Sequence, residues 1–255
     1  MTAPLLTASA LELRYPGREQ AVLQSFDFAL SAGETVSILG PSGVGKSSLL
    51  RVLAGLQSPS SGSVALAGTP LRGVHPRMAV AFQDPSLLPW LTLERNVAFG
   101  LDFKHQPRLS PQARRARIDA AIEEVGLAAA RQHFPDQLSG GMAQRTALAR
   151  CLARKPDILL LDEPFGALDE ITRTEMQQLL LKVVRDFRTA AILITHDIDE
   201  ALLVSDRIVL LGGTPASRIG EWTITLPKPR DDDVAALGAI RIDILSTLRA
   251  AMRRH

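Results

Sequence analysis

The sequence predicts an α/β fold in which a mainly parallel sheet is interrupted by an inserted block of helices. Three observations favour this class. Strand-like apolar runs alternate with amphipathic helical stretches, a glycine-rich loop joins one such run to a helix, and the pattern turns helical between about residues 85 and 154. Strands that alternate with helices are typical of a parallel sheet covered by helices. With 46% hydrophobic residues, the chain has enough apolar side chains for a core of this kind.

The expected strands begin with two alternating segments and continue with short apolar runs. In chain order they are Leu11–Tyr15, Phe26–Leu30, Glu34–Leu39, Ser63–Leu66, Met78–Phe82, Ile158–Leu161, Ala191–Ile194 and Arg207–Leu211. Helices are expected at Pro111–Val125, Gly140–Ala153 and Ile171–Arg185, and after the glycine loop, where Leu49, Leu53 and Leu56 share one face. We therefore predict a catalytic core of residues 1–84 and 156–226, with a helical subdomain at 85–155.

The last segment, residues 227–255, begins with prolines and aspartates and then places apolar residues at helical spacing. These are Leu237, Ile240, Ile244, Leu248 and Met252. The spacing predicts a C-terminal helix docked on the core, and acidic residues at its start fit the helix dipole.

Charge and cysteine content argue against several classes of function. The chain has 29 basic and 27 acidic residues, a net charge of +2, so no binding to nucleic acid is expected. Arg114, Arg115 and Arg117 precede acidic residues on one helix, as is typical of a solvated face. Cys151 is the only cysteine, and its apolar helical setting favours a packed thiol. The N-terminal segment does not resemble a signal peptide, and no run reaches the roughly 18 apolar residues of a membrane span.

A glycine-rich segment matches the pattern GxxxxGK[ST] of phosphate-binding loops. It consists of Gly40, Pro41, Ser42, Gly43, Val44, Gly45, Lys46 and Ser47, and the next residue, Ser48, joins the predicted ATP-binding set. Lys46 is expected to reach the β- and γ-phosphates of a nucleotide, and the Ser47 hydroxyl to ligate Mg²⁺. A plain glycine-rich turn is the alternative. The strand before the loop and the amphipathic helix after it favour nucleotide binding.

Four polar residues at the ends of expected strands complete the predicted hydrolytic site. Asp162 is expected to hold Mg²⁺, and Glu163 to act as the general base that polarises the attacking water. His196 follows another strand, where it would orient that water near the γ-phosphate. Gln83 lies where the core meets the helical insertion, and its amide would touch Mg²⁺ or water. Taken singly, an acidic pair, a histidine or a glutamine at these places is more often structural.

A second glycine segment precedes the helix expected at Gly140–Ala153. It consists of Leu138, Ser139, Gly140, Gly141 and Met142, followed by Gln144 and Arg145. Ser139 would cap that helix, and the exposed N–H groups with the helix dipole would form a second anion site. Alone, this segment would be interpreted as a capped helix with a glycine entry.

With these motifs in this order, the chain resembles the ATP-binding-cassette (ABC) ATPases over essentially its whole length. The resemblance implies a P-loop NTPase (RecA-like) core with an N-terminal antiparallel β part, and ATP with Mg²⁺ as ligands. It implies a head-to-tail homodimer, or a pair of different cassettes, in which Leu138–Met142 of one subunit faces the phosphate loop of the other. It also assigns an adenine-stacking role to Tyr15 and a dimer-contacting loop to Ala167-Leu168-Asp169.

Within that family, several segments resemble bacterial importers of nitrate, taurine, alkanesulfonates or pyrimidine precursors. They are Asp84–Trp90, Glu163–Asp169, Thr195–Ala201 and Leu226–Arg230, whereas Gly213–Ile219 departs from the turn that those relatives carry. The resemblance implies integral-membrane permease subunits, an extracytoplasmic solute-binding protein and a peripheral location on the cytoplasmic face of the inner membrane. Leu88 and Trp90 are candidates for permease contact or for ordinary packing. The alternatives are a separate-subunit exporter or an ABC ATPase that acts on nucleic acid.

Overall fold

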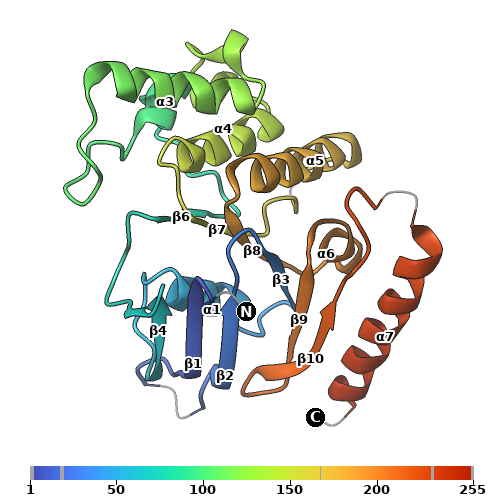
Figure 1. The fold of residues 1–255 in the computed structure, drawn as a ribbon. Coiled ribbons are helices and arrows are strands. Elements are labelled where there is room, and N and C mark those ends of the chain that lie inside the picture. The colour runs from blue at the N-terminus through green and yellow to red at the C-terminus, as the bar shows by residue number, and fades with distance from the viewer. Residues whose placement is uncertain (1–2, 18–19, 167, 231–232, 254–255) are drawn as a thin grey trace. The chain divides into compact units, whose positions relative to one another are not determined.

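The computed structural model describes residues 3–17, 20–166, 168–230 and 233–253 (Figure 1). The chain divides into two compact units, and each is described by itself. The first unit combines residues 1–74 with residues 190–255, and the second consists of residues 75–189. The first unit is therefore discontinuous in sequence, whereas the second is one uninterrupted stretch.

The first unit begins with an antiparallel sheet in the strand order β2-β1-β4-β5. These strands are β1 (Leu6–Leu13), β2 (Leu23–Leu30), β4 (Ser61–Leu66) and β5 (Thr69–Pro70). Along β2 the buried positions are Leu23, Phe26, Phe28 and Leu30, so one face packs inward while the other meets solvent. The structure thus confirms an N-terminal antiparallel β part.

A second sheet in this unit is mainly parallel. Its strands are β3 (Thr35–Leu39), β8 (Ala190–Thr195), β9 (Arg207–Gly212) and β10 (Ser217–Thr223). β3 lies between β8 and β9 and is parallel to both, while β10 is antiparallel to β9. Every residue of β3 and β8 is buried, as expected of parallel strands covered on both faces.

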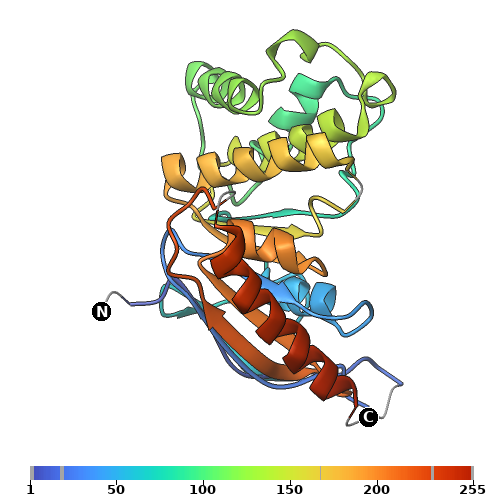
Figure 2. The same cartoon turned by 90° about the vertical axis from the view of Figure 1, so that its right-hand side faces the viewer.

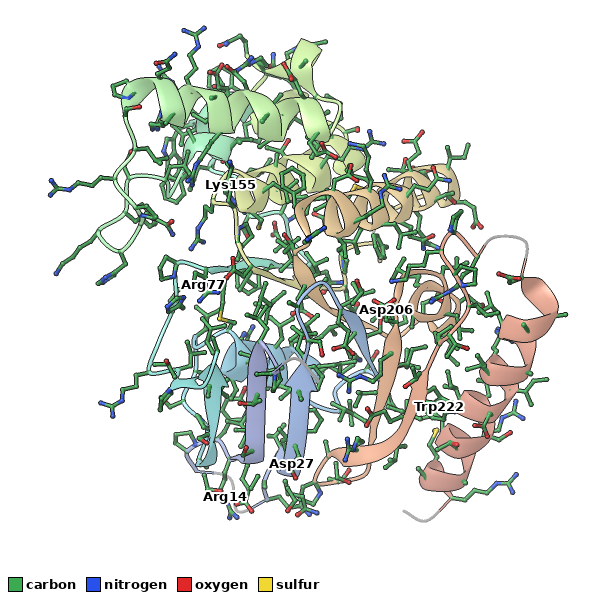
Figure 3. All side chains as sticks on the ribbon, viewed as in Figure 1. Arg14, Asp27, Arg77, Lys155, Asp206 and Trp222 are labelled. Atoms are coloured by element: carbon green, nitrogen blue, oxygen red, sulfur yellow. The ribbon has the colours of Figure 1, made fainter. Side chains whose placement is uncertain are left out.

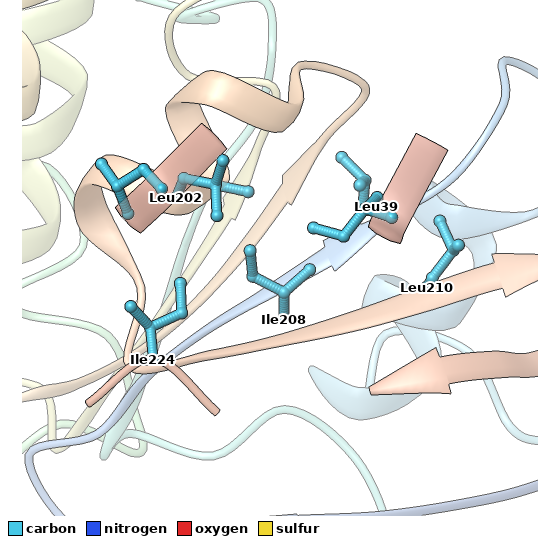
Figure 4. Close-up of a cluster of buried hydrophobic side chains, with 8 residues drawn as sticks. Leu39, Leu202, Ile208, Leu210 and Ile224 are labelled. Atoms are coloured by element: carbon cyan, nitrogen blue, oxygen red, sulfur yellow. The ribbon is translucent and has the colours of Figure 1, made fainter. Parts of the chain in front are cut away.

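Three helices belong to the same unit: α1 (Lys46–Leu53), α6 (Ile198–Val204) and α7 (Val234–Met252). α7 packs along β9, β10 and α6 (Figure 2). A shared apolar cluster joins Leu237 and Ile244 of α7 to residues of the sheet and of α6, among them Leu39, Leu202, Ile208, Leu210 and Ile224 (Figure 4). The C-terminal helix is therefore docked as the spacing predicts. Its last apolar residue, Met252, is 66% exposed and lies beyond this contact.

Polar contacts also fasten the C-terminal segment. Trp222 of β10 donates from Nε1 to Asp243 of α7 at 2.6 Å (Figure 3 labels Trp222). Just before α7, the fully buried Arg230 donates to main-chain carbonyl oxygens. These belong to Leu202 at 2.8 Å, Ser205 at 2.6 Å, Ile224 at 3.4 Å and Leu226 at 3.0 Å. One guanidinium thus holds the ends of α6 and β10 to the segment that leads into α7.

The second unit pairs two parallel strands, β6 (Met78–Ala81) and β7 (Ile158–Asp162), and contains the inserted helices. The α-helices are α2 (Leu93–Ala98), α3 (Pro111–Glu124), α4 (Gly140–Leu152) and α5 (Glu170–Phe187). Two 3₁₀ turns, Ala128–Ala130 and Pro135–Gln137, lie between α3 and α4. Each α-helix begins at a side-chain cap, formed in order by Thr92, Ser110, Ser139 and Asp169.

Three expectations from the sequence differ from the structure. The strand expected at Leu11–Tyr15 is β1, which begins five residues earlier, at Leu6, and ends at Leu13. Leu56 does not continue the apolar face of α1, because the helix ends at Leu53 and Gly55 follows with φ 71°; Leu56 is 47% exposed. α6 and β10 are absent from the predicted elements. Among the residues that the structure describes, no helix has both the length and the apolar run needed to cross a membrane.

Candidate functional site

The glycine loop Gly40–Ser47 connects β3 to α1, as the sequence predicts. Gly43 and Gly45 have φ of 80° and 107°, a region that side chains other than glycine rarely adopt. A Cβ at Gly45 would also lie 2.7 Å from Cγ1 of Val22. Larger residues at these positions would therefore disrupt the curve of the loop.

The Lys46 side chain folds back into this curve. Its Nζ donates to the carbonyl oxygens of Gly40 at 2.8 Å and Pro41 at 3.0 Å, and the residue is 5% exposed. A buried cation among backbone dipoles at a helix N-terminus is an arrangement suited to phosphate oxygens. Beside the loop lies a cavity of about 540 Å³, lined by residues 20–22, Gly43, Val44 and residues 213–216.

Tyr15 lies at the start of the same helix. Its hydroxyl oxygen is 2.8 Å from Oγ of Ser48, in the first turn of α1, and the residue is half-buried. The structure therefore brings two members of the predicted ATP-binding set into contact. This places the aromatic ring beside the phosphate-loop helix, where the resemblance assigns it an adenine-stacking role.

His196 follows β8, next to the start of the phosphate loop. The parallel register pairs Leu39 with Thr195, so Gly40 and His196 occupy the next positions beyond the ends of two adjacent strands. The turn is fixed by Thr195, whose Oγ1 accepts from the N–H of Asp197 at 3.0 Å and lies 2.7 Å from Glu200 Oε2. His196 is exposed, so its imidazole is accessible to a ligand.

In the second unit, Asp162, Glu163 and Gln83 gather at the ends of the paired strands. The register aligns Ala81 with Leu161, so Gln83 and Glu163 lie at matching positions just beyond β6 and β7. Asp162 is buried and Glu163 half-buried. Glu163 has φ 46°, and a left-handed non-glycine backbone costs about 1–3 kcal/mol and concentrates at functional sites.

The second glycine segment forms the start of α4, as predicted. Oγ of Ser139 accepts from the N–H of Met142 at 3.3 Å, so Ser139 caps the helix. Ser139 and Gly140 are exposed, while Leu138, Gly141 and Met142 are half-buried. The exposed N–H end of a helix at least eight residues long suits an anion presented by another molecule.

Asp169 lies near this segment, at the start of α5. Its carboxylate accepts from the N–H and the hydroxyl of Thr172, at 3.0 and 2.7 Å, and these bonds lower the pKa of Asp169. A Cβ at Gly141 would overlap Cγ2 of Thr172. Asp169 and Leu168 are described, whereas Ala167 lies outside the described residues.

Three further side chains of this unit have no role in the sequence-based prediction: Gln144, Arg150 and Asn96. All three hold main-chain atoms of the segment that follows β6. Gln144 is visible in the sequence as part of the pattern after Met142. Arg150 and Asn96 carry no such signal, because their partners are backbone atoms.

Cys151 is buried in α4, and this burial raises the pKa of its thiol to about 11, in line with the predicted packed thiol.

Oxygen ligands for Mg²⁺ are present in both units. The Ser47 hydroxyl lies at the start of α1, and the Asp162 carboxylate at the end of β7. Hydroxyl and carboxylate oxygens are the donors that Mg²⁺ prefers, usually together with phosphate oxygens and water. Each of the two groups, taken within its own unit, is therefore of a chemical type that suits Mg²⁺.

Comparison with known proteins identifies the family. The family model described as ABC transporter matches residues 23–166. The chain is 44% identical over 252 residues to an aliphatic sulfonates import ATP-binding protein of Xanthomonas axonopodis pv. citri, covering 96% of this chain and 98% of that protein. The bicarbonate transport and nitrate import ATP-binding proteins of Synechococcus elongatus are each 44% identical over 215 residues, covering 84% of this chain and 32% of each relative.

Among solved structures, a dimeric ATP-binding cassette in a post-hydrolysis state with ADP and Pi matches with a TM-score of 0.76 and 31% identity, covering 87% of this chain and 100% of that one. The matched family region contains the phosphate loop, Gln83, the second glycine segment and the Asp162-Glu163 pair. The chain therefore belongs to the ABC transporter family, as an ATPase subunit of the ATP-binding-cassette fold.

Proposed function

We propose that the chain powers an importer: it binds and hydrolyses ATP to drive uptake of a small solute through a separate membrane permease. The observation that supports import is the near-full-length similarity to a sulfonates import ATP-binding protein. Aliphatic sulfonates, nitrate and bicarbonate, which appear in the names of the relatives, are all small anions. An aliphatic sulfonate is the solute we propose first, because that relative matches over 98% of its own length.

Each predicted site residue has a place in this function. The loop N–H groups, Lys46 and the α1 dipole would hold the phosphates, and Tyr15 would stack on adenine. Ser47, Asp162 and Gln83 would hold Mg²⁺, which would neutralise charge on the β- and γ-phosphates. Glu163 would accept a proton from the attacking water, and His196 would hydrogen-bond the γ-phosphate. These roles rest on the motif positions and on the local geometry of each unit.

We propose that two copies act together. The exposed N–H end of α4 supports this, since an anion-binding surface at Ser139 would be completed by ATP held on a partner's phosphate loop. A membrane permease would then contact the segment 84–90, where Trp90 is 69% exposed and Leu88 half-buried. In this assembly the chain would lie peripherally on the cytoplasmic face of the inner membrane, and a solute-binding protein would act on the other side.

The test is uptake by a reconstituted transporter. The chain would be purified with its membrane permease and placed in vesicles that contain ATP and Mg²⁺, and the solute-binding protein would be supplied outside the vesicles. We expect ATP-dependent uptake of a labelled aliphatic sulfonate, with none in the Lys46→Ala variant or when EDTA replaces Mg²⁺. Uptake of nitrate or bicarbonate alone would overturn the proposed solute but not import.

Two other outcomes would contradict import. ATP-driven movement of solute in the opposite direction would identify an exporter. Tight, salt-sensitive binding of DNA or RNA without any membrane partner would identify an ATPase that acts on nucleic acid.

A further inference from the structure

Two side chains of α4 donate hydrogen bonds to main-chain carbonyl oxygens of the segment that follows β6. The first is Gln144, which is 7% exposed. Its Nε2 donates to the carbonyl oxygen of Gln83 at 3.3 Å and to that of Pro164 at 3.2 Å. One amide therefore joins the second glycine segment's helix to the residue after Glu163 and to the predicted magnesium-contacting glutamine.

The second side chain is Arg150, farther along the same helix. One terminal nitrogen of its guanidinium donates to the carbonyl oxygen of Ser86 at 3.0 Å, and the other to that of Pro85 at 2.7 Å. The two nitrogens of the planar group thus hold two successive carbonyls. A lysine would have to bond both carbonyls through one nitrogen, so it would not reproduce the two-pronged contact of the planar guanidinium.

Other contacts act on the same segment. Ser86 has φ 46° and its N–H is bonded to the side chain of Asp84, so the chain turns locally here. Farther along, the fully buried Asn96 holds both the N–H and the carbonyl oxygen of Leu88. The position of residues 83–88 is therefore set by side chains of α4 and α2, and Trp90 follows directly.

We propose that Gln144 and Arg150 are positioning residues that make α4, residues 83–86 and Pro164 move as one body. A displacement of the segment before Trp90 would then be transmitted to Ser139–Met142 at the start of α4 and to the residues around Glu163. The connection of α4 to residues 83–86 and Pro164 does not depend on the proposed function. Its consequence for turnover rests on that function.

The positioning role of Gln144 can be tested by substitution, because only the nitrogen of its amide forms hydrogen bonds among the described residues. Its Oε1 is buried and has no hydrogen-bond partner among the described residues, so the amide is oriented only by the two carbonyls that Nε2 meets. Gln144→Met keeps the length of the side chain but removes both donors. Gln144→Glu would place acceptor oxygens against two carbonyl oxygens and should release the segment as well.

The experiment uses Trp90 as its reporter. The chain has two tryptophans, so Trp222→Phe leaves Trp90 as the single one. In this background we would compare Arg150→Ala, Arg150→Lys and Gln144→Met by time-resolved fluorescence anisotropy and by ATP turnover. Lys182→Ala is the control, because Lys182 belongs to α5 of the same unit and forms ion pairs with Glu124 and Asp186, and among the described residues none of these three bonds to residues 83–86.

We expect faster local motion of Trp90 in Arg150→Ala and Gln144→Met than in the parent, and no change in the control. We also expect kcat for ATP to fall about 2- to 30-fold, the span of couplings of this kind, with KM for ATP unchanged. Arg150→Lys should lie between Arg150→Ala and the parent, which keeps the test valid if the alanine variant does not fold.

Unchanged Trp90 anisotropy in both Arg150→Ala and Gln144→Met would contradict the proposal that these side chains hold residues 83–86 to α4. Faster local motion of Trp90 with unchanged kcat would contradict a role of these two side chains in ATP turnover. A parent chain that does not hydrolyse ATP would contradict the proposed function instead, and the anisotropy measurement would still decide whether the two side chains fasten the segment.

Discussion

Gly141 and Thr172 are in such close contact that residue 141 has no room for a side chain. A Cβ there would overlap Cγ2 of Thr172, whose hydroxyl and N–H are both bonded to Asp169. The start of α4 thus packs directly on the first turn of α5. This contact ties the second glycine segment to the loop that ends at Asp169.

Gly141→Ala should therefore destabilise the protein by about 1–3 kcal/mol, the usual cost of overpacking. Thermal unfolding would measure the change. Gly140→Ala is the matched control for stability, because a Cβ at Gly140 meets no atom within 4 Å. Adding Thr172→Ser to Gly141→Ala should restore most of the loss, since serine lacks Cγ2 but keeps the hydroxyl that bonds Asp169. An equal effect at Gly140 and Gly141 would contradict the packing argument.

Tyr15→Ala should weaken ATP binding about fivefold, since stacking of an aromatic ring contributes on the order of 1 kcal/mol. Tyr15→Phe should keep that stacking and lose only the contact between the hydroxyl and Ser48. Titration with a fluorescent ATP analogue would separate the two contributions. If Tyr15→Phe weakened binding as much as Tyr15→Ala, the contact with Ser48 rather than the ring would be the part that matters.

Glu163→Gln should keep ATP binding and slow hydrolysis by about 10²- to 10⁴-fold, the usual contribution of a general base. The substitution preserves size and removes only the capacity to accept a proton. We expect the variant to accumulate as an ATP-bound dimer in gel filtration, because the closed state would no longer be reopened by hydrolysis. Turnover equal to that of the parent would refute the assignment of Glu163 as the base.

Cys151 predicts a loss of stability at alkaline pH. Burial raises the pKa of its thiol from 9.0 to about 11, so the folded chain retains a proton that the unfolded chain loses. The stabilisation is complete below about pH 9 and is lost as the pH rises to 11, by at most about 3 kcal/mol. Urea unfolding at several pH values should show a steeper decline for the parent than for Cys151→Ala. Identical slopes would contradict this prediction.

The fold could be predicted best where strands are buried on both faces. β3, β7, β8 and β9 appear in the sequence as short apolar runs, and each of their bounds differs from the prediction by at most one residue. β10 gave no such signal, because it is an edge strand on which buried positions are missing and Gly220 interrupts the pattern. α6 has only seven residues, Ile198–Val204, so it offers little periodicity.

The candidate site likewise contains some residues that the sequence reveals and others that it does not. Lys46, Glu163 and Ser139 belong to motifs whose spacing follows from the chemistry of phosphate and water, so the sequence reveals them. Arg150 and Asn96 bond to main-chain oxygens, which every residue has, and no pattern of side chains marks those partners. Only the folded backbone shows what they hold.

The order of the strands has a consequence for synthesis on the ribosome. Thr35 of β3 pairs with Ala191 of β8, and all of residues 75–189 are made between them. At 5–20 residues per second, β3 waits about 8 to 30 s for its neighbour while the intervening stretch emerges as a continuous unit. The strand that leads into the phosphate loop is thus made early and paired late, so the nascent chain exposes an apolar segment until β8 emerges.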